Sequence, residues 1–475
     1  MRRGEESKMK RLRTFKVTTE LPHRPFLVHD YHTMPGAFER LMTPWEHVRV
    51  VRKDPTLAEG AVNEFKVRLA PFVWRTWLAE HRDVERGKGF VDDQRKGPFA
   101  YWSHRHVIVK NKGGSLLQDD IEYSLPLGKV GDIFGRRMVR SRLEKMFEWR
   151  STRLSRDLAE VAARPAKKKV MVTGSSGMLG PQLCSFLRVL GHKVTRATRK
   201  ETKPLVGEPE DTPPVEWNPY EEIPPSLFEG YDAVIHLGGV NIGEKRWSQK
   251  RRSAIRRSRE IPTRHLAEAL ASLDDPPMLI CGSAIGWYGS RGEERLTESS
   301  EAGTGFLSEV CQSWESAAEP AIAAGVRTVF LRTGIVLWGT GGVLERLLLP
   351  FLLGLGGPIS GGNQYMSWIH MDDWVRAVHF LLQEEDAEGA YNLTAPSPKS
   401  NGRFARILGD VLNRPSIAPV PGFAITTLFG DMGKELIVEG QHVRPKRLID
   451  AGFRFVHPAL RPALREVLGR DDSEN

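Results

Sequence analysis

Residues 169–180 read KVMVTGSSGMLG, a short apolar run that ends in a turn rich in glycine, and residues 181–190 continue at helical spacing. A strand, a glycine turn and a helix in this order predict the first unit of a parallel α/β sheet. Gly174 permits the tight turn, Gly177 lets the backbone approach a ligand closely, and Gly180 lets the helix pack against the strand. Unpaired N–H groups at the start of the helix favour an anion, so we expect this turn to hold phosphate groups.

A dinucleotide cofactor is the phosphate compound that this pattern indicates. A second strand is expected at 192–198, and Thr198 and Arg199 stand where an acidic residue would bind the ribose of NAD. Because an arginine can pair with a 2′-phosphate, the sequence predicts NADP(H), with NAD as the alternative. A third strand at 231–237 should end against the cofactor, and Arg246 in the basic run beyond it either reaches a phosphate or lies on a solvated face. The predicted cofactor-binding residues are Gly174, Ser175, Ser176, Gly177, Met178, Leu179, Gly180, Thr198, Arg199, Leu237, Gly238, Gly239, Arg246 and Ser283.

Further motifs follow along residues 169–468. They include SAIGWYG at 283–289, FLSEVC at 306–311, LRTGIVL at 331–337, GLGGP at 354–358, WIHMDD at 368–373 and EGQHV at 439–443. Together with the glycine turn, they resemble the atypical extended short-chain dehydrogenase/reductases (SDRs) called epimerase family proteins, which are sugar-nucleotide-epimerase-like. The resemblance implies an α/β Rossmann-type, NAD(P)-binding domain over residues 169–470, including a C-terminal lobe at about 418–468.

The catalytic residues of that family transfer only in part. The resemblance implies a serine that polarises a substrate carbonyl and a YxxxK pair whose tyrosine exchanges the proton. Ser283 matches the serine, whereas residues 306–311, where the pair is expected, contain neither tyrosine nor lysine. Tyr288 is the candidate substitute, and packing of its ring beside Trp287 is the equal alternative. Ser283 and Tyr288 are therefore the predicted catalytic residues, and the absent pair leaves open whether the protein is an enzyme.

The region before the glycine turn follows a different pattern. Strand-like segments at 62–69, 102–109 and 119–125 come after an opening strand at 14–19, and apolar residues at helical spacing within 139–154 predict a long covering helix. An antiparallel sheet under a helix is an α+β arrangement, in which a cavity can form between the two layers.

Three motifs link this region to a second family. PGAFERL at 35–41, PFAYWSHRH at 98–106 and DDIEY at 119–123 resemble the polyketide-cyclase and START-like (SRPBCC) superfamily, which has the helix-grip fold. The resemblance implies a cavity that holds an apolar ligand. His104, His106 and Glu122 could do acid/base chemistry there, but the sequence does not place them together, and we interpret them as polar faces of half-buried strands.

Composition and charge limit the class of protein. The chain has 475 residues, of which 40% are hydrophobic and 27% charged, as is typical of a globular protein with more than one domain. The formal net charge of +10 comes without a nucleic-acid-binding motif, so a nucleic-acid partner is disfavoured, and no segment predicts a membrane span. Three cysteines without paired spacing, and an N-terminus without an apolar signal segment, favour a cytoplasmic protein.

The expected organisation is a basic tail (1–13), a helix-grip domain (14–160), a linker (161–168) and a Rossmann-type domain (169–470). Two functions fit it. The first is an NADP(H)-binding, epimerase-like or oxidoreductase-like protein that acts on a small-molecule substrate. The alternative is a non-catalytic, regulatory NADPH-binding protein whose N-terminal cavity binds an apolar ligand. The sequence does not indicate the oligomeric state.

Overall fold

The computed structural model describes residues 12–54, 57–70, 72–199 and 212–470, and residues 1–11 of the expected basic tail lie outside this part. The chain divides into two compact units, and the main boundary between them lies between Pro165 and Ala166. This boundary falls inside the segment 161–168 that the sequence suggests as a linker, although the helix before it continues to Ala162.

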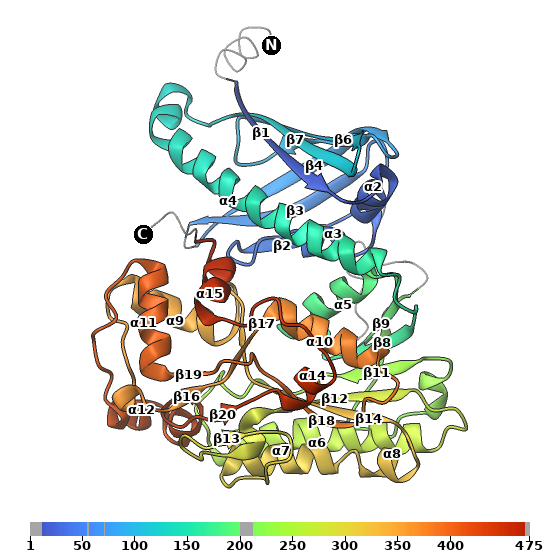
Figure 1. Ribbon diagram of the computed structural model, residues 1–475, viewed down its shortest axis with the longest axis vertical. Helices are drawn as coiled ribbons and strands as arrows, with labels where there is room; N and C mark the ends of the chain where they lie inside the picture. Colours follow the sequence, from blue (N-terminus) through green and yellow to red (C-terminus); the bar gives the residue numbers. More distant parts are fainter. Residues whose placement is uncertain (1–11, 55–56, 71, 200–211, 471–475) are drawn as a thin grey trace. The chain divides into compact units, whose positions relative to one another are not determined.

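The N-terminal unit is built on one antiparallel sheet (Figure 1). Its strands are β1 (Arg13–Leu21), β2 (Val48–Arg52), β3 (Val62–Ala70), β4 (Val73–Glu85), β5 (Gly89–Lys96), β6 (Tyr101–Asn111) and β7 (Gly114–Ser124). They pair in the order β1-β7-β6-β5-β4-β3-β2, so only β1 and β7 are neighbours in space without being neighbours in sequence. Every second residue of β7 from Ser115 to Tyr123 is buried, which is the period of a strand with one covered face.

One long helix, α4 (Gly128–Ala162), lies across this sheet (Figure 1). Its side chains Leu143 and Phe147 form a buried cluster with Phe15 of β1 and Ile121 of β7. The apolar spacing seen in the sequence is therefore the face that covers the sheet, as predicted.

Two short helices, α2 (Pro25–Thr33) and α3 (Ala37–Arg40), connect β1 to β2. Gly36 separates them, because its positive φ of 91° is incompatible with a continuous right-handed helix. Buried Asp157 of α4 accepts hydrogen bonds from the Tyr31 hydroxyl, at 2.8 Å, and from the Arg40 guanidinium, at 2.6 and 2.9 Å. This ion pair fixes both short helices to α4.

The C-terminal unit contains a parallel sheet (Figure 1). Its strands are β8 (Lys169–Thr173), β9 (Lys193–Thr198), β10 (Val215–Glu216), β11 (Ala233–His236), β12 (Met278–Ala284), β14 (Thr328–Thr333) and β18 (Gly389–Leu393), paired in the order β10-β9-β8-β11-β12-β14-β18. The strands expected at 192–198 and 231–237 are β9 and β11. Strand β9 lies on one side of β8 and β11 on the other, so the strand order reverses at β8. In such sheets, ligands bind at the carboxyl ends of the strands beside this reversal.

Helices cover both faces of the parallel sheet (Figure 1). On one face, α5 (Leu179–Val189) lies beside α10 (Met371–Gln383), and the rings of Phe186 and His379 are 5.8 Å apart. On the other face lie α6 (Gln249–Ala271), α7 (Phe306–Ser316) and α8 (Glu319–Ala323), where Leu266 and Trp314 pack with Leu279 of the sheet. The unit thus has the doubly wound, Rossmann-type architecture that the glycine turn predicts.

Shorter elements complete this unit. A buried cluster joins α9 (Gly342–Leu352), α11 (Asn401–Leu412) and α15 (Leu460–Leu468). Three two-stranded pairs are β13 (Arg295–Leu296) with β20 (His442–Val443), β15 (Ile335–Leu337) with β17 (Trp368–His370), and β16 (Tyr365–Met366) with β19 (Lys399–Ser400). The remaining helical segments are η1 (Pro225–Phe228), η2 (Ile285–Tyr288), η3 (Ser360–Gly362), α12 (Gly422–Phe429), α13 (Asp431–Gly433), η4 (Lys434–Val438) and α14 (Lys446–Asp450). Within the described ranges, we find no helix with the length and apolar character that crossing a bilayer requires.

Candidate functional site

The turn between β8 and α5 has glycine at two positions where a side chain would not fit. Gly174 has a φ of +66°, and a Cβ built on it would lie 2.6 Å from the carbonyl carbon of Leu237. A Cβ on Gly180 would lie 2.5 Å from the Cα of Ser175, because the first turn of α5 packs directly on the end of β8. These two glycines have the conformational roles that the sequence predicts for them.

The same turn leaves polar groups available to a ligand. Ser176, Gly177 and Met178 are exposed, and a Cβ on Gly177 would meet only the carbonyl oxygen of Gly174, at 3.4 Å. The Ser175 hydroxyl is buried and forms no hydrogen bond within the described part of the chain. Helix α5 begins at Leu179, directly after these residues, and the first N–H groups of a helix have no partner within the helix. A glycine turn followed by a helix start is the arrangement that binds a pyrophosphate in Rossmann-type domains.

A positively charged residue directly follows β9. Arg199 is exposed, and the structure gives its guanidinium no ion pair among the described residues, while Thr198 is half-buried at the strand end. Because β9 neighbours β8, Arg199 follows the carboxyl end of the strand beside the glycine turn.

Arg259 is a second cation near this edge, and the sequence interpretation missed it. A Cβ on Gly239, just after β11, would lie 3.0 Å from the Arg259 guanidinium carbon. The guanidinium donates to the carbonyls of Val240 and Ile255, at 3.1 and 3.0 Å, and lies 4.9 Å from the centre of the Trp314 ring. No carboxylate pairs with it among the residues that the structure describes. Burial lowers the pKa of Arg259 to about 10, so it stays charged near neutral pH.

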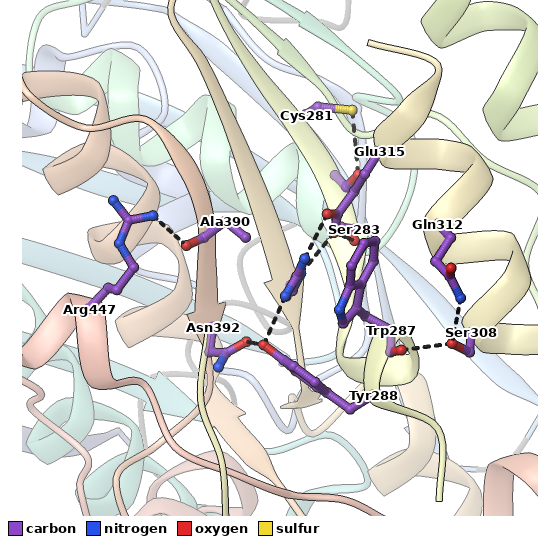
Figure 2. A network of polar contacts seen from close by, with 12 residues as sticks. Cys281, Ser283, Trp287, Tyr288, Ser308, Gln312, Glu315, Ala390, Asn392 and Arg447 are labelled. Atoms are coloured by element: carbon purple, nitrogen blue, oxygen red, sulfur yellow. Dashed lines mark hydrogen bonds and ion pairs between the residues drawn. The ribbon is translucent and has the colours of Figure 1, made fainter. Parts of the chain in front are cut away.

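Ser283 lies at the end of β12 inside a buried polar network, which Figure 2 shows. Its hydroxyl donates to Glu315 Oε1 at 2.6 Å, and the same carboxylate accepts two hydrogen bonds from Arg332, both 2.9 Å long. Because the Ser283 hydroxyl donates its hydrogen bond to this carboxylate, it is not free in this structure to donate to a substrate carbonyl.

Tyr288 belongs to the same network (Figure 2). Its hydroxyl donates to Asn392 Oδ1 at 2.7 Å and accepts from Arg332 at 3.1 Å. The side chain is fully buried, and burial raises the pKa of the hydroxyl. A tyrosine held in this way is not placed to exchange a proton with a substrate, so the geometry does not support it as a substitute for the missing tyrosine.

Comparison with known proteins identifies the relatives of this site. A model described as the NAD dependent epimerase/dehydratase family matches residues 170–394, and a second, described as a domain of unknown function, matches residues 420–467. An epimerase family protein of Mycobacterium bovis is 38% identical over 300 residues, which are 63% of this chain and 97% of that protein. The chain belongs to the epimerase family.

Two solved structures extend this result. A nucleoside-diphosphate sugar epimerase of Corynebacterium glutamicum is 30% identical, with a TM-score of 0.78, over 96% of this chain and 90% of that protein. The human epimerase family protein solved with NADPH is 30% identical, with a TM-score of 0.56, over 63% of this chain and 99% of that protein. The first alignment spans both units, whereas the second has the length of the C-terminal unit alone.

Helix α7 stands where the proton-transfer pair of SDRs is expected. A Cβ on Gly286 would lie 3.2 Å from the Leu307 Cβ and 3.5 Å from the Cys311 sulfur, so these two side chains face the segment after Ser283. They are four residues apart, as in YxxxK, but neither is a proton carrier, because burial raises the pKa of Cys311 to about 12. This member of the epimerase family thus has an apolar surface at that position.

Arg246 contacts the C-terminal lobe. Its side chain is exposed and contacts Gly430, since a Cβ there would lie 3.2 Å from the Arg246 Nε. This contact places it against the residue between α12 and α13, and no hydrogen bond or ion pair links it to the glycine turn in the described structure.

The N-terminal unit contains a cavity of about 550 Å³ between its sheet and α4. His104 and His106 of β6 both line it, and Asp119 Oδ1 lies 2.9 Å from one ring and 2.8 Å from the other. The two histidines do lie on one face of a strand, but the structure also brings them together at one carboxylate, which the sequence interpretation did not expect. Glu122 of β7 is exposed and is not among the lining residues. The strand register that pairs His106 with Asp119 supplies the proximity that the sequence does not show.

Proposed function

We propose that the C-terminal unit binds NADP(H) at the turn 174–180. The observation that carries this proposal is the geometry of the turn, in which Gly174 and Gly180 allow close backbone approach at the start of α5, while the Ser175 hydroxyl has no hydrogen-bond partner among the described residues. The NADPH in the human relative supports the same cofactor.

Two arginines would hold the charged parts of the cofactor and substrate. Arg199 follows β9 without an ion-pair partner among the described residues, and it would pair with the 2′-phosphate. Arg259 lies beside Gly239, farther along the carboxyl edge, where it would neutralise an anionic group of the cofactor or substrate. When bound, the nicotinamide supplies or accepts a hydride.

Two activities follow from this assignment, and different observations favour each. The matching family model is described as an epimerase/dehydratase family, and the Corynebacterium relative is an epimerase. Together with the charged Arg259, these similarities favour an NADP(H)-dependent epimerase or oxidoreductase that acts on a small-molecule substrate. The engaged hydroxyls of Ser283 and Tyr288, and the apolar surface of Leu307, favour the alternative of a non-catalytic NADPH-binding protein.

We further propose that the N-terminal unit is a START-like helix-grip domain that binds an apolar ligand. Its seven antiparallel strands beneath the 35-residue helix α4 support this assignment. The cavity between them is lined with aromatic and aliphatic side chains, including Phe65, Trp77, Trp102 and Phe147.

The test is a titration of the full-length protein with NADPH and with NADH, followed by the fluorescence of the reduced nicotinamide. Saturable binding with a clear preference for NADPH supports the proposal, and binding of neither nucleotide contradicts it. Incubation of the NADP⁺-loaded protein with a panel of nucleoside-diphosphate sugars then separates the two activities. Absorbance growth at 340 nm, or conversion to an epimer, identifies an enzyme.

A further inference from the structure

Five ionisable side chains project from four neighbouring strands onto the cavity side of the N-terminal sheet. They are His81 of β4, Asp92 of β5, His104 and His106 of β6, and Asp119 of β7. The register places them next to each other, because His81 pairs with Asp92, Asp92 with His104, and His106 with Asp119. Hydrogen-bonded strands hold these positions more rigidly than loops would.

Three members of this cluster are spaced as ligands of one metal ion. Asp92, His104 and His106 each offer one donor atom, and these atoms all lie within 4.8 Å of one another. His106 Nε2 is 3.3 Å from Asp92 Oδ2. Metal–ligand bonds of about 2.1 Å separate adjacent donors by roughly 3.0–3.4 Å, so this pair already has the separation of two ligands on one ion.

The other two members are placed to orient those ligands. Asp119 Oδ1 lies 2.8 Å from His106 Nδ1, the ring nitrogen opposite the one beside Asp92. It also lies 2.9 Å from His104 Nε2, and His81 Nε2 lies 2.9 Å from the second oxygen of Asp92. A carboxylate behind a metal-bound imidazole fixes its orientation and raises its basicity, so Asp119 has the position of such a partner.

A structural role alone does not explain these five ionisable side chains. The rest of the cavity wall includes Phe65, Trp77, Phe90 and Trp102, and apolar packing would stabilise this part of the sheet without charged groups. A buried ion pair seldom stabilises a protein more than well-packed apolar residues would. Five ionisable side chains that face one cavity therefore indicate that the cavity binds a ligand.

We propose that Asp92, His104 and His106 bind one divalent first-row transition-metal ion, such as Zn²⁺ or Fe²⁺, with its remaining coordination positions open to the cavity. Two imidazoles and one carboxylate are a ligand set used for both ions, and open positions accept an exogenous oxygen donor. The ligand class that this site would select is a mainly apolar molecule with one carbonyl, hydroxyl or carboxylate oxygen. The proposal concerns the N-terminal unit and does not depend on cofactor binding.

The test uses the full-length protein, stripped with a chelator and titrated with Zn²⁺ by calorimetry and with Co²⁺ by visible absorption. We expect one ion per chain. Asp92→Asn and His106→Gln should lower the affinity at least tenfold, and Asp119→Asn should lower it about 10–100-fold while keeping the stoichiometry. Glu46→Gln is the matched control, because Glu46 lines the same cavity but accepts a hydrogen bond from Arg142 of α4 instead of joining the cluster.

A second cluster in the C-terminal unit, formed by His370, His457 and Glu466, is the competing site. Glu466→Gln removes its carboxylate at a partly exposed position, and it should leave Zn²⁺ binding unchanged. Zn²⁺ should also raise the melting temperature of the wild-type protein and of Glu466→Gln equally. These measurements on the wild type and on Glu466→Gln change no residue of the proposed site. They therefore test the proposal even if the variants of that site fail to fold. Absence of stoichiometric binding to the wild type, or loss of binding in Glu466→Gln, would overturn the proposal.

Discussion

The carboxylate of Glu315 holds the guanidinium of Arg332 through two hydrogen bonds, each 2.9 Å long, one helical turn beyond Cys311. Glu315 belongs to α7 and Arg332 to β14, and Ser283 of β12 donates to the same carboxylate. The helix that carries proton-transfer residues in related SDRs thus joins two strands through buried charge in this protein.

Removal of one partner of this ion pair should be costly. Glu315→Ala leaves the buried Arg332 charge uncompensated, and we expect the free energy of unfolding to fall by about 3–5 kcal/mol. Glu309→Ala is the matched control on the same helix, because Glu309 pairs with Arg256 at an exposed position and its loss should cost less than about 1 kcal/mol. Urea unfolding measures the free energy of unfolding of both variants. An equal loss in the two would show that the buried pair stabilises the protein no more than the exposed pair does.

The second and third glycines of the turn, Gly177 and Gly180, should respond differently to alanine. Gly180→Ala forces a Cβ to within 2.5 Å of Ser175, so it should destabilise the unit by about 1–3 kcal/mol even without cofactor. Gly177→Ala meets only the Gly174 carbonyl oxygen, at 3.4 Å, and should fold normally while weakening NADPH binding. Thermal unfolding with and without NADPH separates the two, and a stable Gly180→Ala protein would show that the tight packing at this turn is absent.

Selectivity between the two nucleotides should depend on Arg199. A charged hydrogen bond to the 2′-phosphate contributes about 1.5–3 kcal/mol, so Arg199→Ala should weaken NADPH binding roughly 10–100-fold. NADH lacks that phosphate and serves as the internal control, because its affinity should not change. An equal loss for both nucleotides would mean that Arg199 acts on the fold or on another part of the cofactor.

Acid should destabilise the C-terminal unit partly through His236. Burial lowers the pKa of His236 to about 4, and its Nδ1 lies 2.7 Å from the Thr173 hydroxyl. Because the unfolded chain takes up this proton near pH 6.5, stability should fall between pH 6.5 and pH 4, by at most about 1.4 kcal/mol per pH unit for this one group. His192 and His379 have lowered pKa values as well and add to the same trend.

His236→Gln tests this contribution. The glutamine can still form a hydrogen bond with Thr173, but it has no group that titrates in this range. The urea midpoint of the variant should therefore depend less on pH between 4 and 6.5 than that of the wild type. Identical pH profiles for the two proteins would assign the acid sensitivity to other groups.

The sequence predicted those features that depend on residues close together in the chain. The turn at Gly174 and Gly180, the strand ending at Thr198 and the long helix over the N-terminal sheet all follow from local spacing, and the structure has them. Arg259 escaped prediction because it belongs to a run of basic residues, and only its helical phase and the packing of Trp314 place it beside Gly239.

The polar cluster in the N-terminal cavity shows a different limit. Asp92, His106 and Asp119 come together through the register of three strands, and no short motif encodes that register. Likewise, Tyr288 lies on the η2 turn, its ring is fully buried, and its hydroxyl bonds to Arg332 and Asn392 of two other strands. Sequence spacing indicated that Tyr288 follows Ser283 closely but not where its hydroxyl points.

The most direct test of the central claim is a calorimetric titration of NADPH into the wild-type protein and into Gly177→Trp, a variant that fills the space above the glycine turn. We predict stoichiometric binding to the wild type and none to the variant, with both proteins folded as judged by circular dichroism. Equal binding to the two proteins would place the nucleotide elsewhere, and no binding to the wild type would contradict the assignment of this turn as a cofactor site.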